Sequence, residues 1–293
     1  MLFRSGAVGL FSVMSAVVKA LGDAVPTGQI VFARSVFALI PVAWLVWHTG
    51  GLHTLQTQRP VGHALRSLAG LTAMFCGFTA LGLAALPDVI AIGFAASVFT
   101  PMLAALVLRE RVGIYRWSAV AVGFAGILVM LQPVGLVLGE TRSAGETLGL
   151  VLALVGAFFV ACATIAVRAL ATREHPAAII FWFTLTCTLA SAATLPFAAI
   201  WPSPREAWML LAIGLLGGCA QILMTRAYVH APASVIAPFD YTALIYATVI
   251  GIAVFGDRLT WPLVVGGSLV VGAGLFIFYR ERRLGLPRGR ARA

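Results

Sequence analysis

Two charged side chains interrupt long apolar stretches of this chain, and both have chemistry suited to binding a small polar molecule. Arg34 lies about seven residues into one stretch, and Asp240 lies about eight residues into another. A charge inside a bilayer costs several kcal/mol unless it is paired or hydrated. One functional interpretation is therefore that one or both line a water-filled cavity and bind the carboxylate or amine of a zwitterion. Another is that Asp240 carries a coupling proton.

A structural role is the alternative for each residue. Arg34 could satisfy backbone carbonyls or a lipid headgroup near the outer surface, and this is the interpretation that we favour for Arg34. Asp240 could hydrogen-bond to neighbouring Tyr or Thr side chains, but for this residue we favour the ligand site.

The sequence offers no pattern typical of an enzyme or of a metal site. It contains no HExxH, no GxSxG and no acidic cluster, and its five histidines have no ligand spacing. The four cysteines fall inside apolar stretches without a CxxC pair, so we interpret them as buried small apolar side chains. We expect no catalytic residue, no metal and no cofactor.

The elements that position Arg34 and Asp240 are predicted to be transmembrane helices. Hydrophobic residues make up 61% of the chain and charged residues only 10%, whereas soluble domains carry about a quarter charged residues. About 20 apolar residues cross the hydrocarbon layer as a helix. Charges, prolines and turn residues divide the chain into ten predicted spans, which are 4–21, 27–48, 65–85, 88–108, 116–132, 147–167, 177–200, 207–228, 233–255 and 262–280.

The basic residues predict which side of the membrane the connections face. An even number of spans places both termini on one side, and with the N-terminus inside, fifteen Arg residues face the cytoplasm while four Lys or Arg face outward. Cytoplasmic connections are enriched in Lys and Arg, so we expect both termini in the cytoplasm. The net charge of +10 then needs no nucleic acid partner. The basic tail 281–293 is interpreted as an anchor beside anionic lipid, with RNA or protein binding as the alternative.

The two halves of the chain resemble each other. Residues 86–94 open the fourth span and residues 231–239 open the ninth with a similar pattern, and each span ends at an acidic–basic pair, Glu110-Arg111 or Asp257-Arg258. We expect these acids to pair locally with neighbouring arginines. Five spans per repeat is an odd number, so the repeats are predicted to be inverted, as in alternating-access carriers.

The repeat also distinguishes Asp240 from its counterpart. Phe239-Asp240-Tyr241 in the second half corresponds to Phe94-Ala95-Ala96 in the first. A ligand site would produce such a departure from internal symmetry, so Asp240 and Tyr241 are the principal candidates for substrate binding.

These features resemble the EamA repeat of the drug/metabolite transporter superfamily. The first half carries the residues of the repeat at Lys19, Arg34, Pro101, 108–111, Gly123 and Gly126, and the second half at Arg168, 255–258 and 272–274. The resemblance implies a first repeat at 1–133 and a second at 145–280. It also implies that spans one, three, four, six, eight and nine enclose a central cavity.

Further candidates follow from that implied cavity. They share side chains suited to a mostly apolar pocket with a few polar contacts, and they are Phe78, Thr79, Phe94, Ser97, Thr164, Gln221 and Tyr246. Each alone is more often a packing residue or one that bonds to its own helix.

The resemblance implies an alternating-access secondary transporter of small organic metabolites in the inner membrane, first of all an amino-acid exporter. A carrier of S-adenosylmethionine or a nucleoside-like metabolite is the alternative, followed by an integral-membrane enzyme or a channel. The expected partners are a small-molecule substrate and the lipid bilayer.

Overall fold

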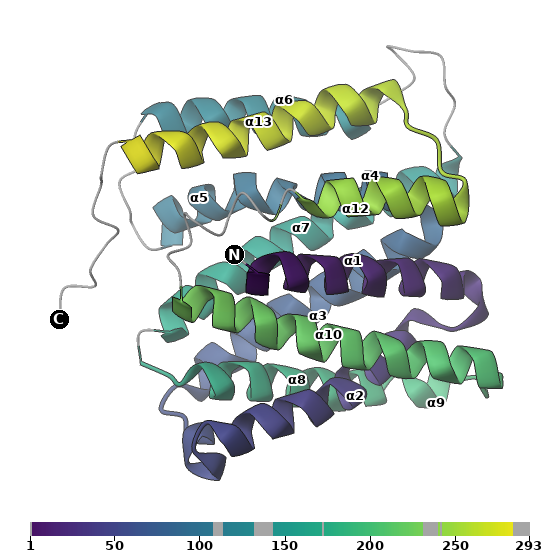
Figure 1. The fold of residues 1–293 in the computed structure, drawn as a ribbon, viewed down its shortest axis with the longest axis vertical. Coiled ribbons are helices and arrows are strands. Elements are labelled where there is room, and N and C mark those ends of the chain that lie inside the picture. Colours follow the sequence, from purple (N-terminus) through teal and green to yellow (C-terminus); the bar gives the residue numbers. More distant parts are fainter. Residues whose placement is uncertain are drawn as a thin grey trace.

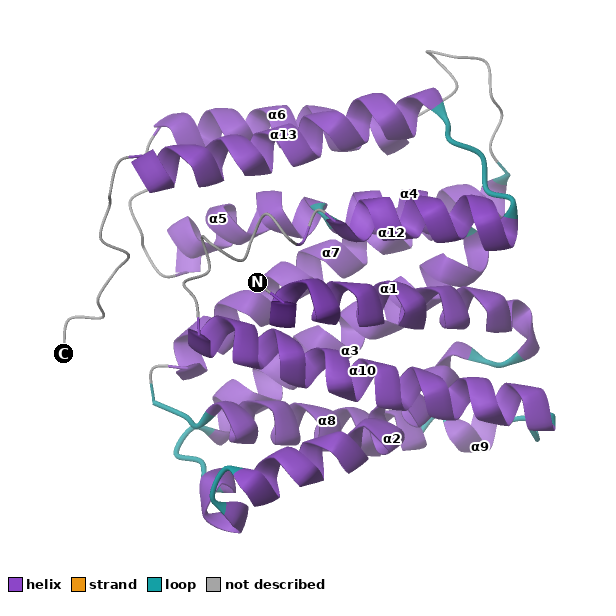
Figure 2. Cartoon of the chain, viewed as in Figure 1, coloured by secondary structure: helices purple, strands orange, loops and turns teal. Residues whose placement is uncertain are grey.

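The chain folds into a stack of long helices (Figure 1, Figure 2). The computed structural model describes residues 2–107, 114–131, 143–171, 173–230, 240 and 242–283, and these residues form helices and short connections without a strand. The helices are α1 (Leu2–Leu21), α2 (Thr27–His48), α3 (Pro60–Leu83), α4 (Leu86–Gly93), α5 (Ala95–Val107), α6 (Ile114–Leu131), α7 (Ala144–Ala171), α8 (Pro176–Ala192), α9 (Leu195–Ala198), α10 (Pro204–His230), α12 (Thr242–Ile250) and α13 (Trp261–Arg283). Shorter turns are η1 (Gly22–Ala24), η2 (Gly51–Leu55) and the π-helical η4 (Gly251–Phe255).

Four of the described helices are long and apolar enough to cross a membrane, judged by length and composition. They are α2, α3, α7 and the part of α10 from Pro204 to Met224. Shorter apolar helices occupy the other predicted spans. The prediction of an all-helical chain is therefore confirmed over the described residues.

The fourth predicted span, 88–108, is not one continuous helix. It is divided into α4 and α5 at Phe94, immediately after Gly93, and glycine has a low helix propensity. Pro101, one of the residues that carry the resemblance to the repeat, lies within α5 and not at the interruption. The ninth span is also irregular, because the π-helical η4 continues directly from α12.

The third helix starts earlier than predicted. The predicted span begins at residue 65, but α3 begins at Pro60, and proline is common in the first helical turn because its missing N–H would have no partner there. Arg66, the second residue of the predicted span, was counted among the arginines that face the cytoplasm. The structure places it inside α3, where it is buried.

All the long helices run roughly along one direction, so the bundle has two ends. α1 runs from the left half of Figure 1 to the right, and α13 runs in the opposite direction and ends at the left; we call the left end of the bundle the terminal face. The other end is the opposite face. Within the bundle, α10 packs against α1 and α2, α3 packs against α7, α2 packs against α8, and α6 pairs with α13.

Glycines allow two of these helix pairs to approach closely. A Cβ atom added at Gly126 of α6 would lie 2.7 Å from the carbonyl oxygen of Gly266 in α13. A Cβ at Gly214 of α10 would lie 2.9 Å from the carbonyl oxygen of Ala33 in α2, and one at Gly218 would overlap Pro41. These small residues let the helix backbones approach closely, as is typical of helix packing in membranes.

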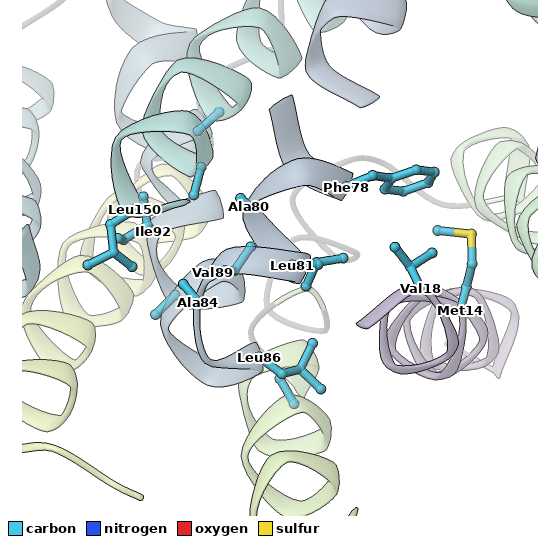
Figure 3. Packing of buried hydrophobic residues seen from close by; sticks show 14 of the residues in the cluster. Met14, Val18, Phe78, Ala80, Leu81, Ala84, Leu86, Val89, Ile92 and Leu150 are labelled. Carbon is cyan, nitrogen blue, oxygen red and sulfur yellow. The ribbon is translucent and has the colours of Figure 1, made fainter. Parts of the chain in front are cut away.

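The main apolar cluster lies where the first, third and fourth helices meet. Phe78 and Leu81 of α3 lie opposite Met14 and Val18 of α1, with Leu86 of α4 close by (Figure 3). In a bilayer, where lipid is as apolar as leucine, such contacts stabilise the fold chiefly by van der Waals packing. Of the cysteines, which were all expected to be buried, Cys187 is buried but Cys219 is exposed.

Candidate functional site

The principal predicted candidate, Asp240, precedes α12 and is half-buried. Its neighbours Phe239 and Tyr241, which complete the predicted aromatic–carboxylate group, lie outside the described residues. The role of this group in substrate binding therefore remains a prediction.

Arg34 lies inside the protein. Its side chain projects from α2, only 4% of the residue is exposed, and its Nε has no hydrogen-bond partner among the described residues. The structural interpretation, in which Arg34 bonds backbone carbonyls or a lipid headgroup, does not match this placement. The guanidinium carbon instead lies 5.8 Å from the centroid of the Phe183 ring in α8.

A second arginine, Arg66 of α3, shares this aromatic ring. Its guanidinium carbon lies 3.6 Å from the ring centroid of Phe183, which is a close cation–π contact. Arg66 is 8% exposed, and both Nε and Nη1 are buried without a hydrogen-bond partner in the described part of the chain. We call Arg34, Arg66 and Phe183 the arginine cluster.

The arginine cluster adjoins helices from both halves of the chain. A Cβ added at Gly217 of α10 would lie 3.0 Å from Met14 Sδ of α1 and 3.1 Å from Arg34 Nε. A Cβ at Gly70 of α3 would overlap Arg66 and lie 2.6 Å from the ring of Phe183. The glycines thus leave the space that the two guanidinium groups occupy.

Four of the further predicted candidates take part in core packing or in hydrogen bonds within the protein. Phe78 belongs to the apolar core, and the Thr79 hydroxyl donates a hydrogen bond to Thr27 Oγ1 at 3.3 Å. Ser97 and Thr164 donate to carbonyl oxygens of Phe94 and Val160, at 2.7 and 2.8 Å. Such bonds are common in apolar helices and do not by themselves indicate a ligand.

The remaining candidates lie on three different elements. Phe94 is the half-buried residue between α4 and α5, Gln221 is half-buried on α10, and Tyr246 on α12 is 40% exposed. The described structure brings none of the candidate residues into the cavity considered next.

A cavity of about 450 Å³ lies between α3, α5 and α7, and it opens to the surface of the bundle, because its lining residues Leu65 and Leu68 are exposed. Its walls are mostly apolar, and Arg59 is the charged residue among those that line it, which also include Leu68, Leu103, Phe159 and Leu170. This volume is in the range of small-molecule sites.

At the opposite face, one lysine joins three separate segments. Lys19 Nζ, near the end of α1, donates a hydrogen bond to the carbonyl oxygen of Ala84 at 2.9 Å and lies 3.6 Å from Asp257 Oδ1. Asp257 Oδ2 accepts the backbone N–H of Leu86 at 3.1 Å. We call Lys19, Ala84, Leu86 and Asp257 the Lys19–Asp257 cluster. The prediction that Asp257 pairs with Arg258 is wrong, because its partner is Lys19, which is far away in sequence.

Gly256, whose backbone is in the left-handed region, positions Asp257. Gly256 has φ of 66°, which glycine adopts without strain, and it ends the π-helical η4. The chain then turns back, so that the Asp257 N–H donates to the carbonyl oxygen of Gly251 at 3.0 Å. Glu110, the corresponding acid of the first half, lies outside the described residues.

At the terminal face, Glu174 fastens the connection before α8 to the connection before α3. It accepts hydrogen bonds from the Thr57 hydroxyl at 3.1 Å and the Gln58 N–H at 3.0 Å, and its Oε2 lies 3.6 Å from His63 Nε2. Burial opposes ionisation, but these hydrogen bonds and His63 outweigh it and lower the pKa of Glu174 below its ordinary value.

Comparison with known proteins identifies the family. The model of the EamA-like transporter family matches residues 1–132 and 147–279 of this chain. The chain belongs to the EamA-like transporter family. Together with the apolar helices, this membership makes it a multi-pass membrane protein.

Three relatives of this EamA-like chain are transporters of different small metabolites. An S-adenosylmethionine uptake transporter of Rickettsia prowazekii is 27% identical, with 90% of this chain and 87% of the relative aligned. A pseudopaline exporter of Pseudomonas aeruginosa is also 27% identical, with 90% of each aligned. A riboflavin transporter of Rhizobium johnstonii is 32% identical over 80% of this chain and 75% of its own length.

A solved crystal structure of another protein has the same fold, with a TM-score of 0.68, 19% sequence identity and 97% of each chain covered. The family and the relatives together support a transporter of small metabolites.

Sequence reasoning missed Arg66 and the pairing of Lys19 with Asp257. Pro60 was the available signal for Arg66, because a proline at the first helical position would have moved the start of the third span from residue 65 to residue 60 and placed Arg66 well inside the helix instead of at its end. No local signal indicated the Lys19–Asp257 pair, since its members are at opposite ends of the sequence.

Proposed function

We propose that this chain is an alternating-access carrier of small organic metabolites in the bacterial inner membrane. Ten spans in two inverted repeats, 1–133 and 145–280, would surround a central cavity. Transport would proceed by movement of helix groups around this cavity, without covalent chemistry.

The observation that carries this proposal is that helix packing is nearly unchanged when the two halves are exchanged. In the predicted repeats α1 corresponds to α7 and α3 corresponds to α10. The first helix of each half packs against the third helix of the other, as α1 with α10 and α7 with α3. The equivalent helices α2 and α8 pack together, and so do α6 and α13. An axis of pseudo-symmetry between the halves would produce this pattern.

The directions of the helices support inversion. α1 starts at the terminal face, whereas its counterpart α7 ends there (Figure 1). The predicted excess of Arg at this end supports a cytoplasmic terminal face. A reporter that is active only in the cytoplasm should therefore be active when it is fused after Arg292. A reporter that is active only outside the cytoplasm should be inactive at the same position, and the reverse result would contradict the orientation.

The Lys19–Asp257 cluster supports a gate at the opposite face. It joins α1, the α3–α4 connection and the segment after η4 through one ion pair and two hydrogen bonds. Opening a path to the outside between these segments would require these contacts to separate. The structure would then represent a state closed at the outer end.

The substrate class is proposed from the relatives and from the predicted zwitterion site. Amino acids and S-adenosylmethionine, which itself carries an amino-acid group, are the first substrates to test. The relatives include both an uptake transporter and an exporter. Export of amino acids remains our proposal for direction.

Counterflow in proteoliposomes tests the function. Vesicles loaded with unlabelled leucine or S-adenosylmethionine should accumulate the labelled compound transiently, and the initial rate should saturate. A conductance that does not saturate would indicate a channel, and chemical conversion of the substrate would indicate an enzyme. Either result, without counterflow of any small metabolite, would refute a carrier.

A further inference from the structure

We propose that Arg34 and Arg66 form a buried oxyanion site, which the transported substrate occupies with a carboxylate group. This inference rests on the proposed transport function and specifies one chemical feature of its substrate.

Neither arginine has an acidic partner among the described residues. The ion pairs between described residues join Lys19 to Asp257 and His63 to Glu174. Arg34 and Arg66 thus bring two positive charges into a buried region and share the same aromatic ring. Phe183 attracts cations only weakly compared with a carboxylate, so it cannot neutralise them. An anion between or beside the guanidinium groups would relieve both the desolvation and the repulsion.

The unpaired donors have the chemistry to bind such an anion. A guanidinium has five N–H donors in a planar fork, and this fork matches the two oxygens of a carboxylate. The Arg66 guanidinium carbon lies over the ring of Phe183 at 3.6 Å, and a ring face offers no lone pair that would use its N–H donors in ordinary hydrogen bonds. Its Nε and Nη1, and the Nε of Arg34, are buried donors that find no hydrogen-bond partner among the described residues.

The site lies deep within the bundle. Arg34 is seven residues from the start of α2 at the opposite face, or about 10 Å along the helix, and Arg66 is six residues from the start of α3 at the terminal face, or about 9 Å. The two side chains approach each other from opposite ends and meet at Phe183. The guanidinium groups therefore lie near the middle of the bundle, where a carrier binds its substrate.

The surrounding helices connect this site to the proposed transport path. Gly217 of α10 and Met14 of α1 border Arg34, and Gly70 of α3 borders Arg66. These three helices are the eighth, first and third predicted spans, which the proposed function places around the central cavity. A substrate in that cavity could place a carboxylate against the arginine cluster while the rest of the molecule contacts apolar walls.

Matched ligand pairs test this assignment. The purified full-length chain is titrated with each of the twenty amino acids and its amide, with S-adenosylmethionine and its decarboxylated analogue, and with sulfate as a simple anion. Binding is followed by the melting temperature and by equilibrium titration. We expect at least one carboxylate to bind tenfold or more tightly than the matched compound that lacks the carboxylate.

Variants test whether Arg34 and Arg66 cause the preference for the carboxylate. Arg34→Gln and Arg66→Gln should each abolish the preference for the carboxylate, and Arg34→Lys should reduce it, because lysine keeps the charge but not the fork. Arg205→Gln is the matched control, since this arginine is exposed at the start of α10. If a glutamine variant does not fold, the Arg34→Lys result decides, and full discrimination in that variant contradicts the proposal.

Other outcomes also overturn the assignment. Equal binding of carboxylates and their amides, stabilisation by sulfate without any carboxylate preference, or no binding of any carboxylate would each do so. Failure here is distinguishable from failure of the proposed function. A chain that shows saturable counterflow without carboxylate preference is a carrier lacking this site, whereas carboxylate binding without counterflow retains the site and refutes the carrier.

Discussion

Replacing Asp257 by asparagine should shift the protein towards a state open at the opposite face. Asp257→Asn keeps the shape of the side chain and one acceptor for the Leu86 N–H, but removes the charge that faces Lys19. Both side chains are largely buried, with 13% and 15% exposed, and their charged atoms lie 3.6 Å apart.

The magnitude follows from this geometry. At an effective dielectric constant of about 20, the attraction at this distance is on the order of 4 kcal/mol, and desolvation offsets part of it. Weakening of the charge-assisted bond from Leu86 adds a contribution of at most about 1 kcal/mol. A net effect of about 1–3 kcal/mol corresponds to roughly a 5- to 150-fold change in the equilibrium between the two states.

Thiol labelling measures this equilibrium. Leu21, which is 3% exposed, lies two residues after Lys19, so a Leu21→Cys reporter should react with a charged thiol reagent only when the opposite face opens. Labelling at this position is read by mass spectrometry, which separates it from the native cysteines. Asp257→Asn should raise the labelling rate by about the factor given above.

The control is a charge exchange, Lys19→Asp with Asp257→Lys, which should restore slow labelling in part. An unchanged rate in Asp257→Asn would refute the reasoning, as would a charge exchange that labels as fast as the single variant. In either case the Lys19–Asp257 cluster would not hold the opposite face closed.

Three further predictions follow from other contacts. Gly126→Leu should destabilise the protein by about 1–3 kcal/mol through overpacking against α13, whereas Gly9→Leu, whose added Cβ has no atom within 4 Å, should have little effect on the melting temperature. Glu174→Gln should lower the melting temperature at neutral pH, because a carboxyl with a lowered pKa stabilises the fold only while it is ionised. The difference in melting temperature should disappear as the pH falls from the ordinary carboxyl pKa of 4.5 through the lowered pKa of Glu174. A difference that stays constant with pH would contradict this prediction. Asp240→Asn should leave expression intact but strongly reduce counterflow or its pH dependence, with a milder effect for Ser97→Ala, and normal transport at every pH would make Asp240 structural.

The helices themselves were largely predictable from the sequence, because an apolar stretch of about 20 residues between charges has few other stable forms in a bilayer. For α2 the predicted and observed bounds coincide. The interruption at Phe94 was not foreseen. An apolar composition that favours a membrane span does not determine whether the helix is continuous, and Gly93 alone is a weak signal.

The candidate site was less predictable, since its contacts join distant parts of the chain. Arg34 could be singled out as a charge in an apolar stretch, but its proximity to Phe183 and Arg66 depends on how α2, α3 and α8 pack. Asp257 stands next to Arg258 in sequence, yet Arg258 is exposed and the partner is Lys19. Where a chain turns, adjacent side chains point in different directions, so the residue next in sequence is a poor prediction of the ion-pair partner.

The extensive packing between the two halves has a consequence for biosynthesis. During translation α1, α2 and α3 enter the membrane well before α10, α8 and α7, the helices against which they pack. Until then, the glycine-lined and arginine-bearing faces of the early helices must be covered by lipid, by the insertion machinery or by each other. The ribosome must therefore translate α7 before α3 finds its main neighbour and α10 before α1 does, and truncated chains that end between the halves should be substrates for membrane proteases.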